Sequence, residues 1–285
     1  MIRTFHHSAY PADRLAVERE ATVSVVVPTR ECADTIGPIA TVLAGLREKG
    51  VIDQVLVVDA DSTDATGRLA AEAGVDVVRE DALLPEYGPT RGKGDAMWRA
   101  LSVCHGDVVC YLDGDSSNFG EHFATGTLGP LLLEPDVAFV KAFYRRPFRT
   151  AEGEQPDGGG RVTELTARPL LRRFWPDLAA VRQPLAGEMA ARREVLWRLP
   201  FSVGYAVETA LLLDVYRAVG LGRLAQVDLD VRQNDHKPLA ELASMADEVL
   251  AAALVRLHRE GRLPEAPAPA PVERPPMADV LAAAA

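Results

Sequence analysis

The 285-residue chain is poor in cysteine and has no long apolar run. Its three cysteines, Cys32, Cys104 and Cys110, form an odd set without a CxxC spacing. This argues against a disulfide framework and favours reduced thiols. No stretch approaches the roughly 18 apolar residues that a membrane-spanning helix needs. The first twenty residues lack the apolar core of a signal peptide, so we expect a cytoplasmic protein with no membrane partner.

An excess of positive charge is also absent, since 31 Lys and Arg face 41 Asp and Glu, for a net charge of −10. This balance argues against nucleic acid or an anionic membrane as the main partner. It leaves room for a local basic pocket that binds a phosphorylated substrate. The length suits one large domain or two fused halves with a sizeable core.

Short apolar runs alternate with longer helical stretches from residue 23 onward. Strands are expected at 23–27, 54–58, 75–79, 107–112 and 136–143, with helices at about 34–49, 62–73, 92–104 and 121–133. Strands that are nearly all apolar predict an α/β fold with a mainly parallel sheet and helices on both faces. After a loop at 147–160, we expect helices at about 161–174, 186–198, 205–219 and 238–258, and one strand at 224–231.

Composition divides the chain into four segments. Residues 1–22 are mixed and polar, which predicts an N-terminal arm. Residues 23–157 hold the strand–helix alternation, and residues 158–260 are mostly helical. Residues 261–285 are rich in proline and alanine, which predicts a disordered tail.

An acidic pair follows the fourth expected strand, where Gly114 separates Asp113 from Asp115. In open α/β sheets, ligands bind at the carboxyl ends of the strands. Two carboxylates there suit Mg²⁺ or Mn²⁺, which bind one or two carboxylates plus substrate phosphates. The alternative is a hairpin turn, for which Asp-Gly is also well suited. The position after a buried strand favours a metal that would neutralise charge on a leaving diphosphate.

A second acidic cluster follows the second expected strand. Ser62 and Asp64 there suit helix capping, whereas Asp59 suits contact with a nucleoside. Near the end of the strand at 224–231, His236 could complete a metal site. A lone histidine in such a place is more often structural.

Glycines and cations stand together at two expected helix starts. Lys93 lies between Gly92 and Gly94, a pattern that suits a diphosphate but does not match the P-loop spacing. The run Gly158–Gly160 precedes Arg161 and Thr163, which together suit an anionic group and indicate a phosphorylated or carboxylated acceptor. For Arg145 and Arg146, solvated charge and function are both open.

These elements, in this order, resemble the glucosyl-3-phosphoglycerate synthases, retaining glycosyltransferases of the GT-A fold. The resemblance covers about residues 23–250. Its most specific segments are GKGDAMWRAL (92–101), VKAFYRRP (140–147), GGGRVTELTARPLL (158–171), QPLAGE (183–188), GYAVE (204–208) and KPLAELASM (237–245). It implies transfer of glucose from a nucleotide-sugar to the 2-hydroxyl of 3-phosphoglycerate, with Mg²⁺ or Mn²⁺ and in a homodimer.

By this resemblance, residues 23–157 bind the nucleotide-sugar donor and residues 158–260 bind the acceptor. The implied catalytic residues are Asp115, Glu208 and Arg161. The implied donor contacts are Pro28, Thr29, Arg30, Asp59, Ala60, Lys93, Asp113, Gly114 and Glu208. The implied acceptor contacts are Gly160, Arg161, Val162, Thr163, Tyr205 and Arg232, and the metal ligands are Asp115 and His236.

The sequence departs from the family pattern at three positions. Cys32 stands where a glutamate is expected to contact uracil, and Ala60 where a serine is expected. Asn234 stands where the metal-binding histidine is expected, with His236 two residues later. The donor base therefore stays open between uridine and guanosine, and the second metal ligand between His236 and Asn234.

Two other classes compete with a transferase. A sugar-1-phosphate nucleotidyltransferase would carry a glycine-rich loop after the first strand, where this chain reads PTRECADT. A non-catalytic nucleotide-sugar-binding protein is compatible with the altered donor positions. The intact pair of Asp113 and Asp115, together with Lys93 and Arg161, favours the enzyme.

Overall fold

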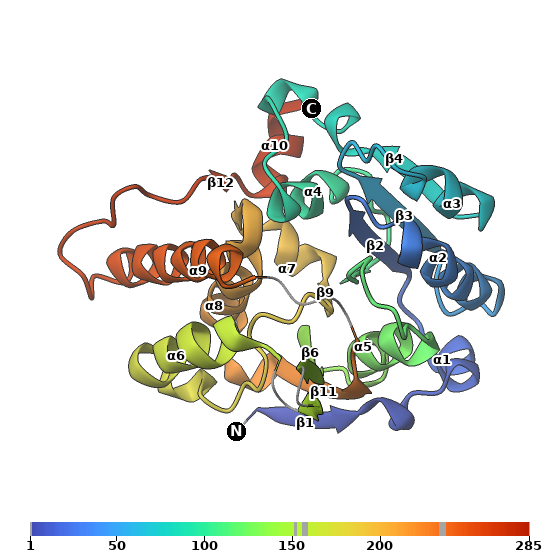
Figure 1. Ribbon diagram of the computed structural model, residues 1–285, viewed down its shortest axis with the longest axis horizontal. Coiled ribbons are helices and arrows are strands. Elements are labelled where there is room, and N and C mark those ends of the chain that lie inside the picture. Colours follow the sequence, from blue (N-terminus) through green and yellow to red (C-terminus); the bar gives the residue numbers. More distant parts are fainter. Residues whose placement is uncertain (1, 151–152, 156–158, 234–237, 285) are drawn as a thin grey trace.

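One sheet of eight strands forms the centre of the molecule (Figure 1). The computed structural model describes residues 2–150, 153–155, 159–233 and 238–284. The strand order is β1-β11-β6-β9-β5-β2-β3-β4. The strands are β1 (Arg3–His6), β2 (Val23–Thr29), β3 (Gln54–Asp59), β4 (Asp76–Arg79), β5 (Val108–Tyr111), β6 (Phe139–Arg145), β9 (Met189–Arg192) and β11 (Leu224–Val231). Every neighbouring pair is parallel except those of β9 with β5 and β6. The predicted mainly parallel α/β fold is confirmed.

Helices cover both faces of the sheet, as the all-buried strand β5 requires. One core joins the sheet to α1 (Ala12–Glu18), α2 (Ala33–Glu48), α3 (Thr66–Glu72) and α5 (Glu121–Leu133). The core on the other face includes α4 (Lys93–Ala100), α7 (Arg193–Trp197), α8 (Val207–Val219) and α10 (Met277–Ala284). Helices α6 (Arg168–Phe174) and α9 (Leu239–Arg259) lie outside α8 (Figure 1).

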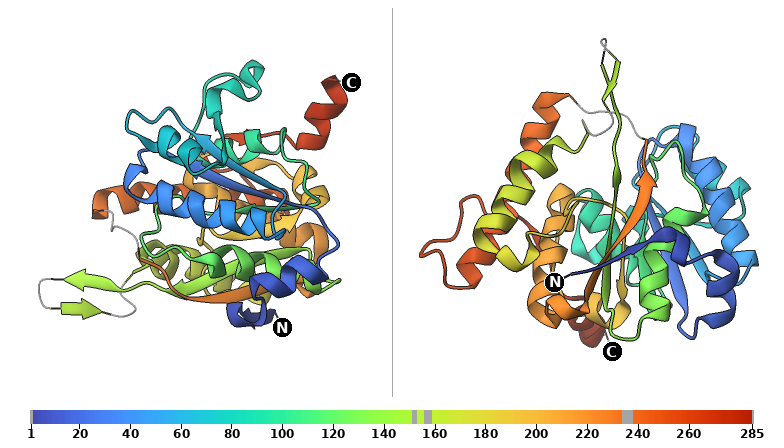
Figure 2. Two further views of the ribbon diagram at one scale, coloured as in Figure 1. Left: turned by 90° about the vertical axis from the view of Figure 1, so that its right-hand side faces the viewer. Right: turned by 90° about the horizontal axis from the view of Figure 1, so that it is seen from below.

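Shorter elements complete the chain. The antiparallel pair β7 (Phe148–Thr150) and β8 (Gly153–Gln155) projects from the body in both views of Figure 2. A π-helix at Thr163–Ala167 leads into α6. Short 3₁₀ turns occur at His7–Ala9, Glu80–Ala82, Pro85–Tyr87, Pro176–Leu178, Gly204–Ala206 and Leu221–Arg223. Among the described helices, none combines the length and the apolar character that crossing a membrane would require.

The expected helix at 186–198 is wrong, because its first half is the strand β9. Residues Met189–Arg192 pair antiparallel with both β5 and β6, and only Arg193–Trp197 is helical. The run Met-Ala-Ala-Arg consists of good helix formers, so its local preference favours a helix. Burial between two strands overrides that preference, since the first three residues of β9 are buried.

Both ends of the chain contain regular elements that were not predicted. The N-terminal arm supplies the edge strand β1, which pairs with β11 from Arg3↔Ala225 to His6↔Asp228. The expectation of a disordered tail is wrong for its last part. Strand β12 (Glu273–Arg274) pairs with β10 (Phe201–Ser202), and α10 buries Met277 in the core. Composition misled here because a few anchoring residues lie among many prolines and alanines.

Candidate active site

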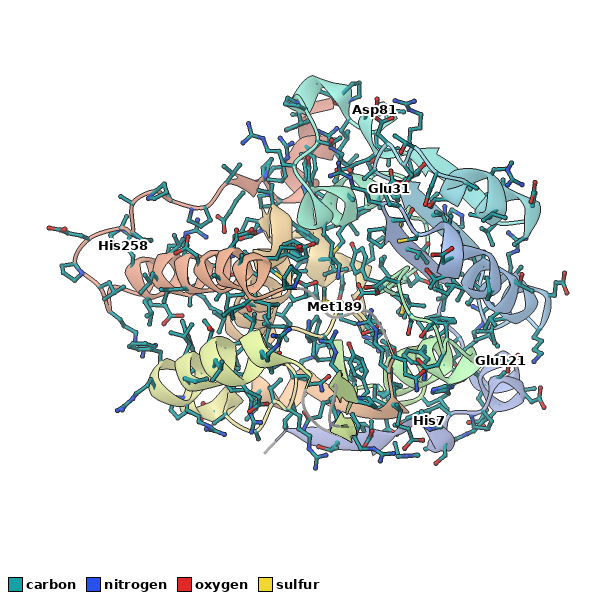
Figure 3. All side chains as sticks on the ribbon, viewed as in Figure 1. His7, Glu31, Asp81, Glu121, Met189 and His258 are labelled. Atoms are coloured by element: carbon teal, nitrogen blue, oxygen red, sulfur yellow. The ribbon has the colours of Figure 1, made fainter. Side chains whose placement is uncertain are left out.

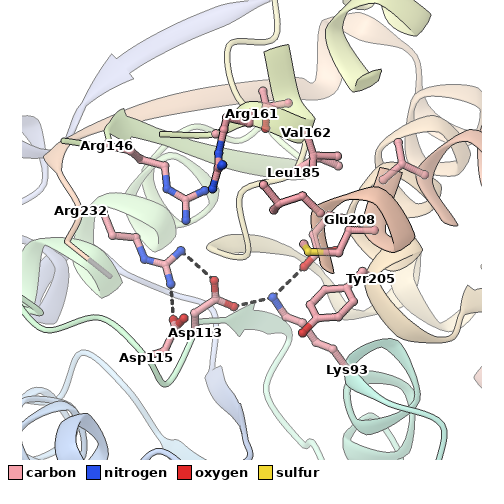
Figure 4. Close-up of a pocket in the computed structure, with 15 residues that line it drawn as sticks. Lys93, Asp113, Asp115, Arg146, Arg161, Val162, Leu185, Tyr205, Glu208 and Arg232 are labelled. Atoms are coloured by element: carbon pink, nitrogen blue, oxygen red, sulfur yellow. Dashed lines mark hydrogen bonds and ion pairs between the residues drawn. The ribbon is translucent and has the colours of Figure 1, made fainter. Parts of the chain in front are cut away.

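A pocket that is partly open to solvent lies beyond the carboxyl ends of β5, β6 and β11 (Figure 4). Its walls come from the loops that follow these strands, from the starts of α4 and α8, and from α9. The lining residues are Lys93, Asp113, Asp115, Arg146, Gly160, Arg161, Val162, Thr163, Leu185, Tyr205, Glu208, Arg232, Leu242, Met245 and Val249. The structure thus brings together all the predicted acceptor contacts and all the predicted catalytic residues.

Lys93 stands between two carboxylates at the floor of the pocket. Its Nζ lies 2.5 Å from Asp113 Oδ1 and 2.7 Å from Glu208 Oε1. Burial by itself favours the neutral amine, but the two carboxylates outweigh it and raise the pKa of Lys93. The lysine therefore stays charged at neutral pH and fixes the position of Glu208.

Glycine is required beside Lys93 by close packing. A Cβ on Gly94 would lie 2.0 Å from the carbonyl oxygen of Ser202, which belongs to β10. This contact seats the start of α4 against β10 and places Lys93 at the pocket floor. Gly94, which was expected to suit a diphosphate together with Gly92 and Lys93, is thus also required by packing.

Arg232 joins the two aspartates of the acidic pair. Its guanidinium lies 2.9 Å from Asp113 Oδ2 and also forms an ion pair with Asp115 Oδ1. Burial would raise the pKa of Asp113, but the charges of Lys93 and Arg232 hold it below its usual value. Asp113 is therefore ionised throughout the neutral range.

Behind Arg232 lies a buried pair that the predicted site did not contain. Tyr144 Oη donates to Glu188 Oε2 at 2.7 Å and accepts from Arg232 Nη1 at 2.8 Å. Burial raises the pKa of Glu188, although the charge of Arg232 opposes this shift. Both residues belong to segments that carried the family resemblance, VKAFYRRP and QPLAGE, and this was the signal that could have identified them.

Gly187 leaves the space that the carboxylate of Asp113 occupies. A Cβ at this position would lie 2.1 Å from Asp113 Oδ1. Only glycine at position 187 leaves room for this carboxylate, so the backbone before β9 packs directly against Asp113.

The upper wall of the pocket is cationic. Figure 4 shows Arg146 and Arg161 reaching into the same space above Arg232. Gly160 has a φ of 75° and turns the chain into the helical stretch that carries Arg161. Four lining cations thus face three lining carboxylates, a local positive balance in an acidic protein. Arg146 had been left open between solvated charge and function, and its place in the wall favours function.

One wall of the pocket is apolar. Helix α9 contributes Leu242, Met245 and Val249, and the loop before β9 contributes Leu185. None of these was among the predicted site residues, because an apolar stripe at helical spacing is usually core. Apolar contact excludes water around the charged groups and so strengthens their interactions.

The predicted donor residues at the ends of β2 and β3 lie side by side but outside the lining of this pocket. Thr29 pairs with Asp59 in the sheet, and the Ala60 N–H donates to Thr29 O at 2.9 Å. Pro28 precedes Thr29 in β2, and Arg30 follows it and is exposed. Ser62 Oγ donates to Asp59 Oδ1 at 2.5 Å.

Gly114 links these strand ends to the acidic pair. A Cβ on it would lie 2.8 Å from Thr29 Cγ2 and 3.6 Å from Cys32 Sγ. Burial raises the pKa of the Cys32 thiol to about 11. Cys32 is therefore a neutral group beside the acidic turn, where the family pattern has a carboxylate.

The two aspartates differ in their ability to hold a metal. The Asp115 side chain is 58% exposed, whereas that of Asp113 is 16% exposed and held by both Lys93 and Arg232. Asp115 is a hard oxygen ligand of the kind that Mg²⁺ and Mn²⁺ prefer. A metal fits at Asp115 on these grounds. The predicted ligand His236 and its alternative Asn234 lie outside the described residues.

The parallel sheet with one inserted antiparallel strand, the acidic pair after β5 and the charged pocket define a glycosyltransferase of the GT-A fold. Comparison with known families agrees, because a model described as glycosyl transferase family 2 matches residues 24–184. The chain belongs to the glucosyl-3-phosphoglycerate synthase family. It is 41% identical over 267 residues to the glucosyl-3-phosphoglycerate synthase of Petrotoga mobilis, across 92% of this chain and 82% of that protein.

Other relatives support the same assignment. The glucosyl-3-phosphoglycerate synthase of Mycolicibacterium smegmatis is 44% identical over 245 residues, across 86% of this chain and 80% of that protein. A crystal structure of mannosyl-3-phosphoglycerate synthase from Rubrobacter xylanophilus superposes with a TM-score of 0.90 at 45% identity, covering 98% of this chain and 97% of that one.

A structure of the Mycobacterium tuberculosis glucosyl-3-phosphoglycerate synthase in complex with Mn²⁺, UDP and glucosyl-3-phosphoglycerate has a TM-score of 0.85 at 37% identity. It covers 99% of this chain and 100% of that one. Another structure of that enzyme contains Mg²⁺ and UDP. Both predicted cations therefore occur together with the nucleotide in a relative.

Proposed function

We propose that this protein transfers glucose from a nucleotide-sugar to the 2-hydroxyl of 3-phosphoglycerate, with retention of anomeric configuration and with Mg²⁺ or Mn²⁺ bound. The observation that carries the proposal is the gathering of Lys93, Arg146, Arg161 and Arg232 around the acidic pair. An acceptor with a phosphate and a carboxylate matches this positive wall. The M. tuberculosis relative contains a phosphoglyceric acid together with UDP-glucose and Mn²⁺ in one complex.

On the acceptor side, Arg161 and Thr163 would hold the phosphate or carboxylate, with Gly160 and Val162 supplying backbone. A guanidinium matches a carboxylate or phosphate with two parallel hydrogen bonds. Arg146 would add a further cation to this wall. Tyr205 and Arg232 would lie beside the acceptor, close to the reacting hydroxyl.

On the donor side, Lys93 and Asp113 would lie at the diphosphate and sugar, and Glu208 would accept hydrogen bonds from sugar hydroxyls. Pro28, Thr29, Arg30, Asp59, Ala60 and Gly114 would line the nucleoside. Asp115 would hold the metal, together with His236 or Asn234. A bound Mg²⁺ or Mn²⁺ would supply positive charge beside the leaving diphosphate.

Catalysis would depend mainly on positioning and electrostatics, with Asp115, Glu208 and Arg161 as the residues in contact with metal or substrate. Glu208 is fixed by Lys93, and its side chain is only 6% exposed. This fixation suits a group that orients a sugar better than one that attacks it. The leaving diphosphate would assist removal of the proton from the acceptor hydroxyl. Retention of anomeric configuration is tested by proton NMR of the product.

A second candidate differs in the donor. The R. xylanophilus neighbour is a mannosyl-3-phosphoglycerate synthase, and it superposes with this chain over nearly its whole length. Cys32, as a neutral thiol, also leaves the base-binding end without the family's carboxylate. Donors with guanosine or with mannose are therefore the alternatives to UDP-glucose. A non-catalytic nucleotide-sugar-binding protein is the remaining alternative.

The test is release of nucleoside diphosphate by the purified protein. UDP-glucose, GDP-glucose and GDP-mannose are compared with and without 3-phosphoglycerate, in Mg²⁺ and in EDTA. We expect release that requires both the acceptor and the metal. Release that does not depend on 3-phosphoglycerate, or none with any donor, would refute the proposed acceptor or the proposed activity.

A matched pair of variants tests the acceptor site. Arg161→Met removes a cation from the pocket wall, whereas Arg145→Met removes an exposed cation that does not line it. Loss of a charge-assisted contact of about 1.5–3 kcal/mol raises the KM for 3-phosphoglycerate by about 10-fold or more in the first variant. The second variant should keep the parent value. Equal KM values in both variants would remove Arg161 from the acceptor site.

Assembly as a homodimer and action in the cytoplasm are further parts of this proposal. The dimer is tested by sedimentation equilibrium over a range of protein concentrations, where a single monomeric mass would exclude it.

A further inference from the structure

A cluster of two histidines and an aspartate lies at the edge of the sheet, outside the pocket just described. His7 Nε2 is 2.7 Å from Asp230 Oδ2, and His6 Nε2 is 3.4 Å from Asp230 Oδ1. Figure 3 shows His7 near the lower edge of the molecule, directly after the end of β1. None of these three residues lines the pocket. The proposed function gives this cluster no role.

Three local features of the backbone bring these side chains together: a turn after β1, a register shift in β11 and a positive φ at Asp230. Neighbouring residues in a strand point to opposite faces, but β1 ends at His6 and a 3₁₀ turn begins at His7. This turn brings the two imidazole rings to 4.4 Å between centroids. A register shift between Asp228 and Val231 interrupts β11, and Asp230 has a φ of 64°. Such a bulge re-aims a side chain, and here the carboxylate meets both histidines.

We propose that His6, His7 and Asp230 form a second metal site, which takes a transition-metal ion of the zinc class. The possible ligand atoms all lie within 4.8 Å of one another. Zinc bonds of about 2.0–2.1 Å at tetrahedral angles place ligand atoms about 3.3 Å apart, so a small adjustment suffices. Imidazole favours zinc, whereas Mg²⁺ prefers oxygen ligands and water. The site therefore differs in metal preference from Asp115.

The groups around the cluster suit such an ion. His6 Nδ1 accepts from the Ser8 backbone N–H at 3.2 Å and also lies 2.8 Å from Ser8 Oγ, and these contacts hold the ring with Nε2 toward Asp230. A metal that binds Nε2 would displace the proton that this nitrogen carries in the neutral ring. The ring of His122 packs on His7 at 4.8 Å between centroids.

A metal here would fasten the N-terminal segment to β11. His6 and His7 come from the edge strand and its turn, while Asp230 stands two residues before Arg232. The unfolded chain does not hold these ligands together, so binding would stabilise the folded state. The proposal does not depend on the transferase activity, and its test uses no turnover.

The experiment uses protein without an affinity tag, so that no added histidines compete. Zn²⁺ is titrated in excess Mg²⁺, and bound zinc is counted by elemental analysis in the parent and in Asp115→Asn. We expect one zinc per chain in both, and a thermal midpoint raised by roughly 5 °C at about 100-fold excess over the dissociation constant. Mg²⁺ alone should leave the midpoint of Asp115→Asn unchanged.

His7→Gln is the variant that removes a ligand, and His105→Gln changes an exposed histidine elsewhere as its control. Loss of a direct ligand should weaken zinc binding by more than the about 10–100-fold that outer-shell changes cost. His105→Gln should bind zinc as the parent does. If His7→Gln does not fold, Asp230→Asn takes its place. Zinc that is lost in Asp115→Asn but kept in His7→Gln, or absence of zinc in the parent, would overturn the proposal.

Discussion

Arg274 is the residue through which the C-terminal segment reaches the active site. Its Nε and Nη2 each lie 2.7 Å from an oxygen of Asp95, whose side chain is fully buried. Asp95 Oδ2 also accepts from the Arg91 N–H at 2.9 Å. That bond closes the turn that leads into Lys93. The replacement Arg274→Met therefore perturbs a buried ion pair and a pocket residue together.

The expected loss of stability follows from what remains around Asp95. Without Arg274, its nearest remaining cation is Arg99, with Nε at 3.3 Å. Removing one partner of a buried ion pair costs about 3–5 kcal/mol, because the other charge is left without compensation. For a chain of this size, that loss lowers the thermal midpoint by on the order of 10 °C. We also expect a higher KM for the nucleotide-sugar, since Arg274 also donates to the carbonyl oxygens of Tyr87 and Pro89 in the segment that leads to Lys93.

Thermal unfolding and donor KM are measured for Arg274→Met, for Asp95→Asn and for the double variant. The double variant should be more stable than additivity predicts, because it leaves no unpaired carboxylate. Arg259→Met is the control, since Arg259 pairs with Glu273 nearer the surface and its side chain is 42% exposed. Such a pair is worth about 0–1 kcal/mol. A loss below 1 kcal/mol in Arg274→Met, with an unchanged KM, would refute the reasoning.

Two further predictions concern Gly187 and Glu80. Gly187→Ala places a Cβ against the carboxylate of Asp113. We expect kcat to fall by about 100-fold, because the carboxylate is displaced, while the thermal midpoint changes little. A kcat close to the parent value would show that the loop adjusts without moving Asp113. Burial, assisted by the charge of Asp95, raises the pKa of Glu80 from its ordinary value of 4.5 to about 7. The folded state therefore holds a proton that the unfolded state has lost, and stability falls as pH rises from about 4.5 to 7. Glu80→Gln should remove this fall, with a gain of about 3 kcal/mol in the free energy of unfolding above pH 7 relative to pH 4, measured by urea unfolding. A gain that does not depend on pH would contradict the raised pKa.

The sequence was most informative where apolar strands end in polar residues. Strands β2, β3 and β5 are apolar throughout most of their length, so their carboxyl ends could be located along the chain. Parallel strands bring such ends to one edge of the sheet, and this placed Asp113 and Asp115 correctly. The family resemblance implied site roles for Arg161, Glu208 and Arg232, and all three line the same pocket. Their exact contacts, such as Lys93 between two carboxylates, needed the structure.

The parts that were missed depend on contacts between distant segments. Strand β9 has helix-forming residues and becomes a strand only because β5 and β6 leave a place between them. The C-terminal segment has a composition typical of disorder, and its anchors are contacts with distant residues, among them the ion pair of Arg274 with Asp95 and the burial of Met277. Tyr144 and Glu188 both contact Arg232, and Arg146 lies over the ring of Tyr144. The family segments include both residues, but the local sequence does not show which partners they meet.

The two aspartates of the acidic pair differ in their exposure and in their ion pairs. Asp113 is enclosed by Lys93 and Arg232 and limited by Gly187, so its carboxylate cannot turn without breaking two ion pairs. Asp115 is mostly exposed and has only Arg232 as its cation among the described residues. A metal that binds Asp115 competes with one guanidinium, whereas at Asp113 it would compete with two cations at once. We therefore expect Asp113 to hold Lys93 and Arg232 in place. Asp115 would exchange its contact with Arg232 for the metal. The charges around the leaving group would then be fixed before the reaction begins.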